Sequence, residues 1–150
     1  MRQTIILVIS LLVCSGQISA GEPKINIELT AYLPGIGIEY QWDESKTVGL
    51  NYAAVLENIN ISLTSYDKAA LSGGYYTNIF LGYDNNNNIG LGTGDFVYLG
   101  GVFGRQWLWD NGININADAG LLGIYFPTSG EMLPSPAFAI SLGYIFSLTP

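Results

Sequence analysis

The chain has 150 residues, which is enough for one domain with its own core. Only 11% of the residues are charged, against roughly 25% in an ordinary soluble domain, whereas glycine (19 residues) and tyrosine (10 residues) are abundant. The formal charge of −7 excludes nucleic acid as a partner, because that binding depends on Lys and Arg neutralising phosphates.

The first 20 residues predict a secretory signal peptide. Arg2 precedes an apolar run at 5–13, which is shorter than the ~20 residues that a spanning helix needs, and the run leads to small residues at 19–21. Cleavage after Ala20 removes the only cysteine, Cys14, so no disulfide is expected in the remaining chain. The alternative is an N-terminal membrane anchor that stays attached.

The single domain expected over 21–150 begins with two alternating runs of apolar and polar or small residues, the pattern of β-strands with one apolar face. Apolar residues lie at odd positions over 25–33 and at even positions over 36–42. Pro34-Gly35 separates the two runs, and a change of parity requires a turn or a bulge there. We expect the turn.

Polar residues 43–46 form the next connection, and the alternating run 47–56 follows it. Glu57-Asn58 is a candidate turn before a fourth run at 59–66. A loop at 67–73 then leads to the second half of the chain.

The fifth run, 74–84, alternates clearly and ends at a sequence rich in Asn and Gly over 85–94, which predicts a long loop. The sixth run, 95–109, is less regular, because apolar residues occur on both of its faces. Gly100-Gly101 is a candidate bulge within it.

Asp110-Asn111-Gly112 is a strong turn signal. The seventh run, 113–125, follows it and restores the alternation. Pro- and Ser-containing residues 126–136 predict a second long loop. The final run, 137–147, has bulky apolar residues on one face and mostly small residues on the other.

Eight alternating runs without a long apolar helix indicate an all-β fold, an eight-stranded antiparallel up-and-down transmembrane β-barrel. Large residues would face lipid and small or polar residues would fill the narrow interior. The two longest loops would then lie on the outer side of the membrane, as this class prefers. The alternative is a soluble β-sandwich, which the shortage of charged residues for its outer faces opposes.

Aromatic residues gather near the ends of the strands that run toward the periplasm. Because amphipathic rings favour the boundary between lipid and water, we expect them to form an interfacial girdle. The members of this girdle are Trp42, Trp107, Trp109, Tyr144 and Phe146.

The interior positions predict a cluster of polar side chains that bond to one another and to trapped water. Its charged members are Glu28, Glu39, Arg105 and Asp118. We expect Arg105 to point inward and pair with one of the three carboxylates, and the alternative is an outward Arg105 that reaches the periplasmic headgroups. The neutral members are Asn26, Gln41, Asn51, Asn60, Ser62, Thr64, Asn78, Asn114 and Asn116.

Several glycine- and aromatic-rich segments resemble the small outer-membrane β-barrel proteins of Gram-negative bacteria, over most of 24–147. These segments are 35–40, 74–76, 99–104 and 141–146. The resemblance implies an outer-membrane location, contact with outer-membrane lipid and a structural or interaction role. The ending also looks like the signal that the barrel-insertion machinery reads on a last strand, with Gly143, Tyr144 and Phe146 as its residues, although four further residues follow it here.

The chain contains no histidine. Lipid-modifying barrel enzymes, which this architecture also resembles, use a histidine as general base, so that chemistry is not expected. Glu28 and Glu39 could act as an acid and base pair, but nothing else in the sequence supports catalysis, and we expect no enzyme and no cofactor. Residues 84–88 with Asp95 are rich in oxygen ligands but lack the spacing of a calcium loop, so no metal site is expected.

Two other functions remain as alternatives to the membrane barrel. One is a secreted soluble barrel that binds a small apolar ligand, which the inward polar residues oppose. The other is a barrel enzyme that acts on lipid, which the missing histidine opposes.

Overall fold

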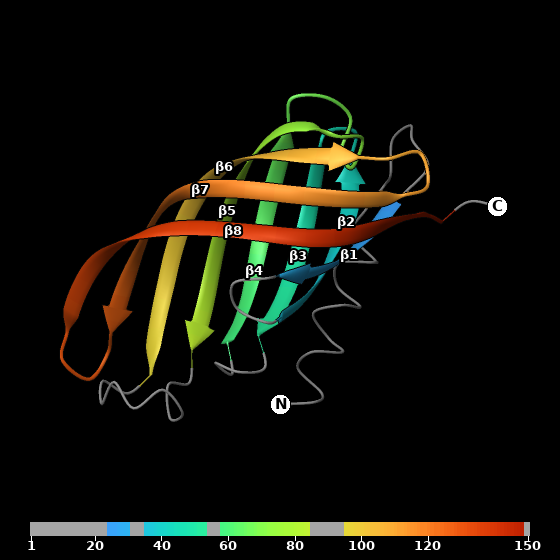
Figure 1. The fold of residues 1–150 in the computed structure, drawn as a ribbon. Helices are drawn as coiled ribbons and strands as arrows, with labels where there is room; N and C mark the ends of the chain where they lie inside the picture. Colours follow the sequence, from blue (N-terminus) through green and yellow to red (C-terminus); the bar gives the residue numbers. More distant parts are fainter. Residues whose placement is uncertain (1–23, 31–34, 54–57, 85–94, 149–150) are drawn as a thin grey trace.

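The computed structural model describes residues 24–30, 35–53, 58–84 and 95–148, and these form a closed barrel of eight antiparallel strands (Figure 1). Each strand pairs with the next in sequence, and β1 pairs with β8 to close the sheet. The predicted all-β, eight-stranded up-and-down barrel is therefore confirmed. The strands are β1 (Lys24–Thr30), β2 (Gly35–Asp43), β3 (Lys46–Ala53), β4 (Asn58–Tyr66), β5 (Gly74–Asp84), β6 (Phe96–Leu108), β7 (Ile113–Phe126) and β8 (Glu131–Ser147).

Some predictions fall on residues outside the described part of the chain. They are the signal peptide at 1–20, the long loop at 85–94, and Pro34 and Glu57 of the two candidate turns. The second residues of those turns, Gly35 and Asn58, are the first residues of β2 and β4. Within the described ranges, no helix has the length and apolar character needed to cross a membrane.

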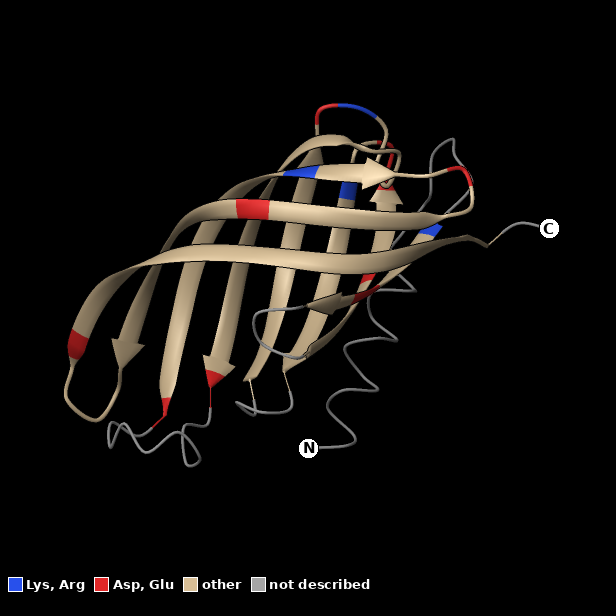
Figure 2. Ribbon diagram, viewed as in Figure 1, with Lys and Arg blue, Asp and Glu red and all other residues tan. Residues whose placement is uncertain are grey.

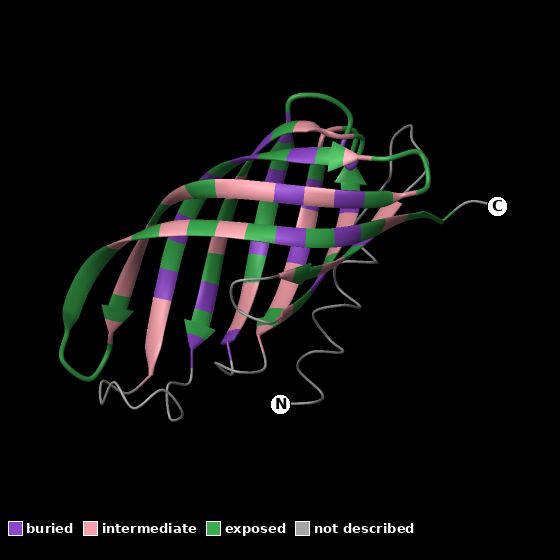
Figure 3. Cartoon of the chain, in the orientation of Figure 1, coloured by how far each residue is buried: buried purple, intermediate pink, exposed green. Residues whose placement is uncertain are grey.

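The alternation expected from the sequence is present along the strands. In β6, Tyr98, Val102 and Gln106 are buried inside the barrel, whereas Leu99 and Phe103 are exposed on its outer surface. Figure 3 shows the same alternation of buried and exposed residues on neighbouring strands. The barrel is therefore small and polar inside and apolar outside, the reverse of a soluble sandwich.

Gly100-Gly101 contains no bulge. The register between β5 and β6 is continuous from Gly74, opposite Gln106, to Asp84, opposite Phe96. Because the side chains of a strand alternate without interruption, this register fixes which residues of β6 face inward.

The predicted loop at 126–136 is wrong. The turn is limited to residues 127–130, and β8 begins at Glu131 and pairs with β7 along its whole length. Pro134 and Pro136 suggested a loop because proline cannot donate a ladder hydrogen bond. They are tolerated in the segment 131–140, which among the described residues pairs with β7 alone, since β1 pairs only with β8 residues from Ser141 onward.

Inward aromatic rings lie opposite glycines on the neighbouring strand. Tyr76 faces Gly104, Phe80 faces Gly100 and Tyr98 faces Gly82 across the β5–β6 pair. A Cβ atom built on any of these three glycines would come within 2.1–2.5 Å of the facing ring. Glycine therefore provides the space in which the rings fit inside a narrow barrel.

The turn at 67–73 closes one end of the barrel. Ala70 and Leu71 have no exposed surface, and they pack with Tyr66, Tyr76 and Ile145 into an apolar cluster. The backbone N–H of Ala70 donates to the carbonyl of Glu44, which holds the turn against the neighbouring one. We call residues 67–73 the plug turn. The sequence predicted a loop at these residues, but its inward fold is new.

Candidate functional site in the barrel interior

A cavity of about 50 Å³ lies within the barrel next to the plug turn, and polar side chains from seven strands surround it. Its wall brings together all three predicted interior carboxylates, Glu28, Glu39 and Asp118. The other side chains of the wall come from Asn51, Ser62, Thr64, Tyr66, Tyr76, Asn78, Asn116 and Ser141.

Glu28, in the middle of β1, accepts hydrogen bonds through both of its oxygens. The amide nitrogens of Asn26 and Asn116 donate to Oε1, and the hydroxyl of Ser141 donates to Oε2 over 3.1 Å. The register of the β1–β8 and β7–β8 pairs places these three strands side by side, which explains why residues far apart in sequence meet here.

Glu39, on β2, is held in the same way by donors without charge. Thr47 donates to its Oε1, and the Tyr66 hydroxyl lies 3.1 Å and 3.3 Å from its two oxygens. The amide nitrogen of Asn26 also reaches Oε2 over 3.5 Å, so that one amide connects Glu39 with Glu28. Asn26 itself has no exposed surface and accepts from Asn114 over 2.9 Å.

Asp118, on β7, accepts a 2.7 Å hydrogen bond from the Tyr76 hydroxyl. The rings of Tyr66 and Tyr76 lie 5.7 Å apart and belong to the apolar cluster of the plug turn. The two tyrosines therefore connect the plug turn to Glu39 and Asp118.

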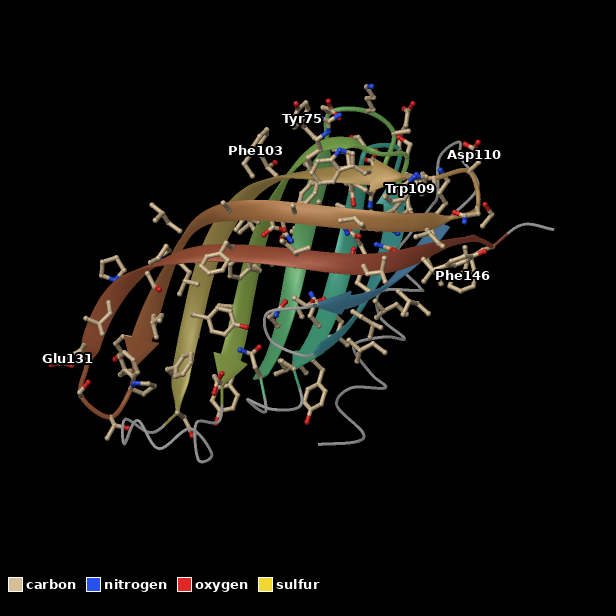
Figure 4. All side chains as sticks on the ribbon, in the orientation of Figure 1. Tyr75, Phe103, Trp109, Asp110, Glu131 and Phe146 are labelled. Carbon is tan, nitrogen blue, oxygen red and sulfur yellow. The ribbon has the colours of Figure 1, made fainter. Side chains whose placement is uncertain are left out.

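The predicted inward pairing of Arg105 with these carboxylates is wrong. Arg105 is exposed on the outer surface, with its guanidinium 5.2 Å from the ring centre of Tyr75 and 5.3 Å from that of Trp107. Figure 4 shows Tyr75 and its stacking partner Phe103 on this outer face. The uninterrupted register through Gly100-Gly101 puts odd-numbered residues of β6 outside, and the sequence alone did not settle that parity.

No basic side chain compensates the interior carboxylates within the described part of the chain. Lys46, Lys68 and Arg105 are exposed, and Lys24 is half-buried at the first residue of β1. Figure 2 shows the basic residues toward one end of the barrel, while Asp118 lies on the long β7 strand. All the hydrogen bonds that the three carboxylates receive from side chains come from amides and hydroxyls.

Two residues that line the cavity have a buried amide oxygen without a hydrogen bond, Asn78 and Asn116. Asn116 is 6% exposed, and its Oδ1 receives no hydrogen bond although its Nδ2 donates to Glu28, Asn114 and Ser141. Among the described residues, no three acidic side chains converge closely enough to chelate one metal ion directly. The interior thus carries three carboxylates and two amide oxygens without a donor around one space.

Several residues of this network were not predicted as interior polar residues. They are Thr47, Asn58, Tyr66, Gln106 and Ser141, all of which are buried. Thr47, Asn58, Tyr66 and Ser141 lie on the inward face by the alternation of their own runs, so a stricter use of the alternation would have found them. Gln106 lies on β6, where the sequence alone did not settle which parity faces inward. Tyr66 was harder to recognise because a tyrosine is typical of the lipid-facing side as well.

The five aromatic residues predicted as a girdle are all exposed and lie at the barrel end that carries the turns at 44–45 and 109–112. Figure 4 shows Trp109 and Phe146 near this end and Glu131 at the opposite one. Tyr144 and Phe146 are in contact, with ring centres 4.6 Å apart. Gly143 faces inward, where a Cβ would lie 2.6 Å from Asn26 Oδ1.

Comparisons with known proteins find no match to a protein family, to a curated protein or to a solved structure. The functional argument therefore rests on the geometry of this chain.

Proposed function

We propose that this chain is an integral outer-membrane β-barrel protein with a structural or interaction role and a filled interior. The observation that carries the proposal is the apolar outer surface. The exposed fraction of its large apolar residues runs from 39% for Ile27 to 70% for Leu121. They include Leu29, Ile36, Ile38, Ile61, Leu63, Ile79, Leu81, Leu99, Phe103, Phe138, Ile140 and Leu142.

Charged residues are almost absent from this surface within the described strands (Figure 2). Lys24, Asp43, Lys46, Asp84 and Glu131 occur at the first or last residue of a strand, and the three interior carboxylates line the cavity. Arg105 is the exception. It lies close to the end of β6, where its long side chain can extend to a headgroup region.

A contiguous apolar surface around a closed sheet has a high free energy in water, because its contact with water is unfavourable. In lipid the same surface contacts hydrocarbon, which is favourable. Strands β5 to β8 have 11, 13, 14 and 17 residues, which suffice for the roughly 9–11 residues that a tilted membrane strand needs. These lengths support insertion.

The filled interior supports a role without transport or catalysis. The cavity of about 50 Å³ is lined by Tyr66 and Tyr76, which pack against the plug turn, and many of the polar side chains around it bond to one another. Ser141, the only serine that contacts a carboxylate among the described residues, is 7% exposed and is not accessible to a substrate. We therefore propose a protein that is not an enzyme.

The outer-membrane location follows from the predicted signal peptide and from the family resemblance. Outer-membrane lipid would contact the apolar belt, and the barrel-insertion machinery would recognise the last strand through Tyr144 and Phe146. Both side chains are exposed on the outer surface, where a partner can reach them.

Fractionation of expressing Gram-negative cells tests the proposal. We expect the protein in the outer-membrane fraction, with different mobility of unboiled and boiled samples in detergent gels, because a closed barrel resists unfolding. Recovery in the soluble periplasmic fraction with equal mobility would contradict the membrane proposal and favour the soluble barrel.

A further inference from the structure

Arg105 is a cation without a counter-ion on the apolar outer surface. Its guanidinium lies 5.2 Å from the ring centre of Tyr75 and 5.3 Å from that of Trp107, and no carboxylate of the described residues forms an ion pair with it. The carboxylate of Asp67 instead accepts the backbone N–H of Tyr75 over 3.0 Å. Because a cation that faces hydrocarbon alone is unfavourable, the guanidinium requires an anion or water from outside the chain.

Tyr75 and Trp107 bring two further hydrogen-bond donors to the same place. Tyr75 lies directly opposite Arg105 in the β5–β6 pair, and Trp107 is the next outward residue of β6. Both side chains are exposed, and among the described residues neither the Tyr75 hydroxyl nor the Trp107 indole N–H has an acceptor. Three donors that gather around one positive charge suit a ligand with several acceptor oxygens and a negative charge, which is the chemistry of a phosphate.

The outer surface beside these donors has small side chains between bulky ones. Ala117 of β7 lies opposite Arg105 on β6 and Ile140 on β8. Ala119, the next outward residue of β7, lies opposite Phe103, so the two alanines lead from Arg105 away from the girdle end of the barrel. Because alanine projects less than its neighbours, a hydrocarbon chain can lie along β7 here. The donors and the alanines together fit a lipid whose phosphate lies at Arg105.

We propose that Arg105, Tyr75 and Trp107 bind the phosphate of an anionic phospholipid in the leaflet at the girdle end of the barrel. The inference rests on the proposed insertion into a membrane. Arginine presents several N–H donors in one plane, which matches the oxygens of a phosphate. A phosphatidylglycerol headgroup is favoured over a phosphatidylcholine headgroup, because the ammonium group of choline already compensates the phosphate that carries it.

Quenching of Trp107 by brominated lipids tests the site on the purified full chain in vesicles. Bromine atoms on an acyl chain quench a tryptophan that they contact, and the Trp107 ring lies beside the guanidinium. The chain has three tryptophans, so Trp42→Phe with Trp109→Phe leaves Trp107 as the reporter. In phosphatidylcholine vesicles, we expect brominated phosphatidylglycerol to have about fivefold higher apparent affinity for this position than brominated phosphatidylcholine, the effect of one cation beside an anionic headgroup.

Variants of the reporter chain locate the headgroup. Arg105→Gln should remove the preference, whereas Arg105→Lys should keep part of it, because lysine retains the charge but not the planar set of donors. Lys68→Gln changes an exposed cation of the plug turn and should leave the preference unchanged. A second reporter, made by Trp107→Phe with Trp109→Phe, keeps Trp42 of β2 and should show no preference. Different mobility of unboiled and boiled samples verifies that each variant still forms a closed barrel.

Several results would overturn the proposal. Equal quenching of Trp107 by the two brominated lipids is one, and a preference that Arg105→Gln retains is another. A preference of the same size at Trp42 would indicate a general attraction for anionic lipid. Loss of the preference with inorganic phosphate, but not with sodium chloride at the same ionic strength, would indicate a site for the free anion. A barrel that does not insert is recognised separately, because brominated phosphatidylcholine itself would then not quench Trp107, and that result would overturn the proposed function as well.

Discussion

At the scale of single residues, the interior is assembled from pairs in which an aromatic ring fills the space above a glycine. The ring of Tyr98 covers Gly82 and its hydroxyl donates to Asn58 over 2.6 Å, so the glycine makes both the packing and the hydrogen bond possible. The same relation holds for Tyr76 over Gly104, and there the hydroxyl reaches Asp118. Small residues on one strand thus determine where polar groups on the next can go.

Gly82→Ala should destabilise the barrel by about 1–3 kcal/mol, the usual cost of overpacking. The added Cβ would lie 2.1 Å from the Tyr98 ring, which would have to move and give up its hydrogen bond. Denaturant unfolding in detergent measures the change. Gly101→Ala is the matched control, because Gly101 faces outward and its nearest neighbour would be the Asn78 carbonyl at 3.8 Å. Equal losses in the two variants would contradict the role of the ring and glycine pairs.

At the scale of the elements, the plug turn differs from the other described turns because it contributes side chains to the core. Leu71 has no exposed surface and a φ of 54°, an uncommon backbone conformation for a bulky residue. Burial of the leucine side chain beside Tyr66 and Tyr76 offsets the free-energy cost of this backbone conformation. The turn therefore acts as part of the fold and not only as a connection.

Leu71→Ala should cost about 2–5 kcal/mol, the range for truncation of a buried leucine. Alanine keeps the same backbone requirement, so the change isolates the lost packing. Lys68→Ala in the same turn is exposed and should change stability by less than about 0.5 kcal/mol. Thermal unfolding of both variants in detergent measures the difference, and a neutral Leu71→Ala would mean that the plug turn is not packed in solution.

At the scale of the whole molecule, the barrel depends on the seam between its first and last strands. β1 and β8 pair over seven residues, from Lys24 with Ser147 to Thr30 with Ser141. This pairing removes the free edges that would otherwise recruit other strands.

A disulfide across the seam tests closure and register together. Ile27→Cys with Tyr144→Cys introduces two directly opposed residues, at a separation that a disulfide can bridge. We expect oxidation to cross-link them and to increase resistance to unfolding on non-reducing gels. Ile27→Cys with Leu142→Cys is offset by two residues and should cross-link poorly. Equal cross-linking of the two pairs would contradict the register.

Much of this molecule could be predicted from the sequence, because alternation is a local property. The alternation predicted eight strands. It also predicted that Glu28, Glu39 and Asp118 point into the barrel and that the aromatic residues of the girdle point outward. The side of the sheet on which Arg105 lies depended on whether Gly100-Gly101 shifts the register of β6. Only the pairing of β6 with its neighbours decides this. The start of β8 was missed because the sequence does not show that, among the described residues, this segment pairs with β7 alone, which is the arrangement that tolerates the two prolines.

The inward fold of the plug turn could not be predicted from alternation, because alternation ends where a strand ends. Ala69, Ala70 and Leu71 form a short apolar run in this loop, and that run was the local sign of burial. The cavity likewise required the pairing of β1 with β8 and of β7 with β8, which brings Asn116 and Ser141 to Glu28.

The length of β8 has a consequence for orientation. β8 has 17 residues, so at a rise of roughly 3.3 Å per residue it measures about 56 Å along the strand. Figure 1 shows the β7–β8 hairpin extending beyond the neighbouring strands, and its outer face stays apolar as far as Met132, which is 70% exposed. In a hydrocarbon layer of roughly 30 Å, a strand of this length remains immersed only if it is strongly inclined to the membrane normal. If the barrel inserts as proposed, the length of β8 therefore favours an inclined β7–β8 hairpin.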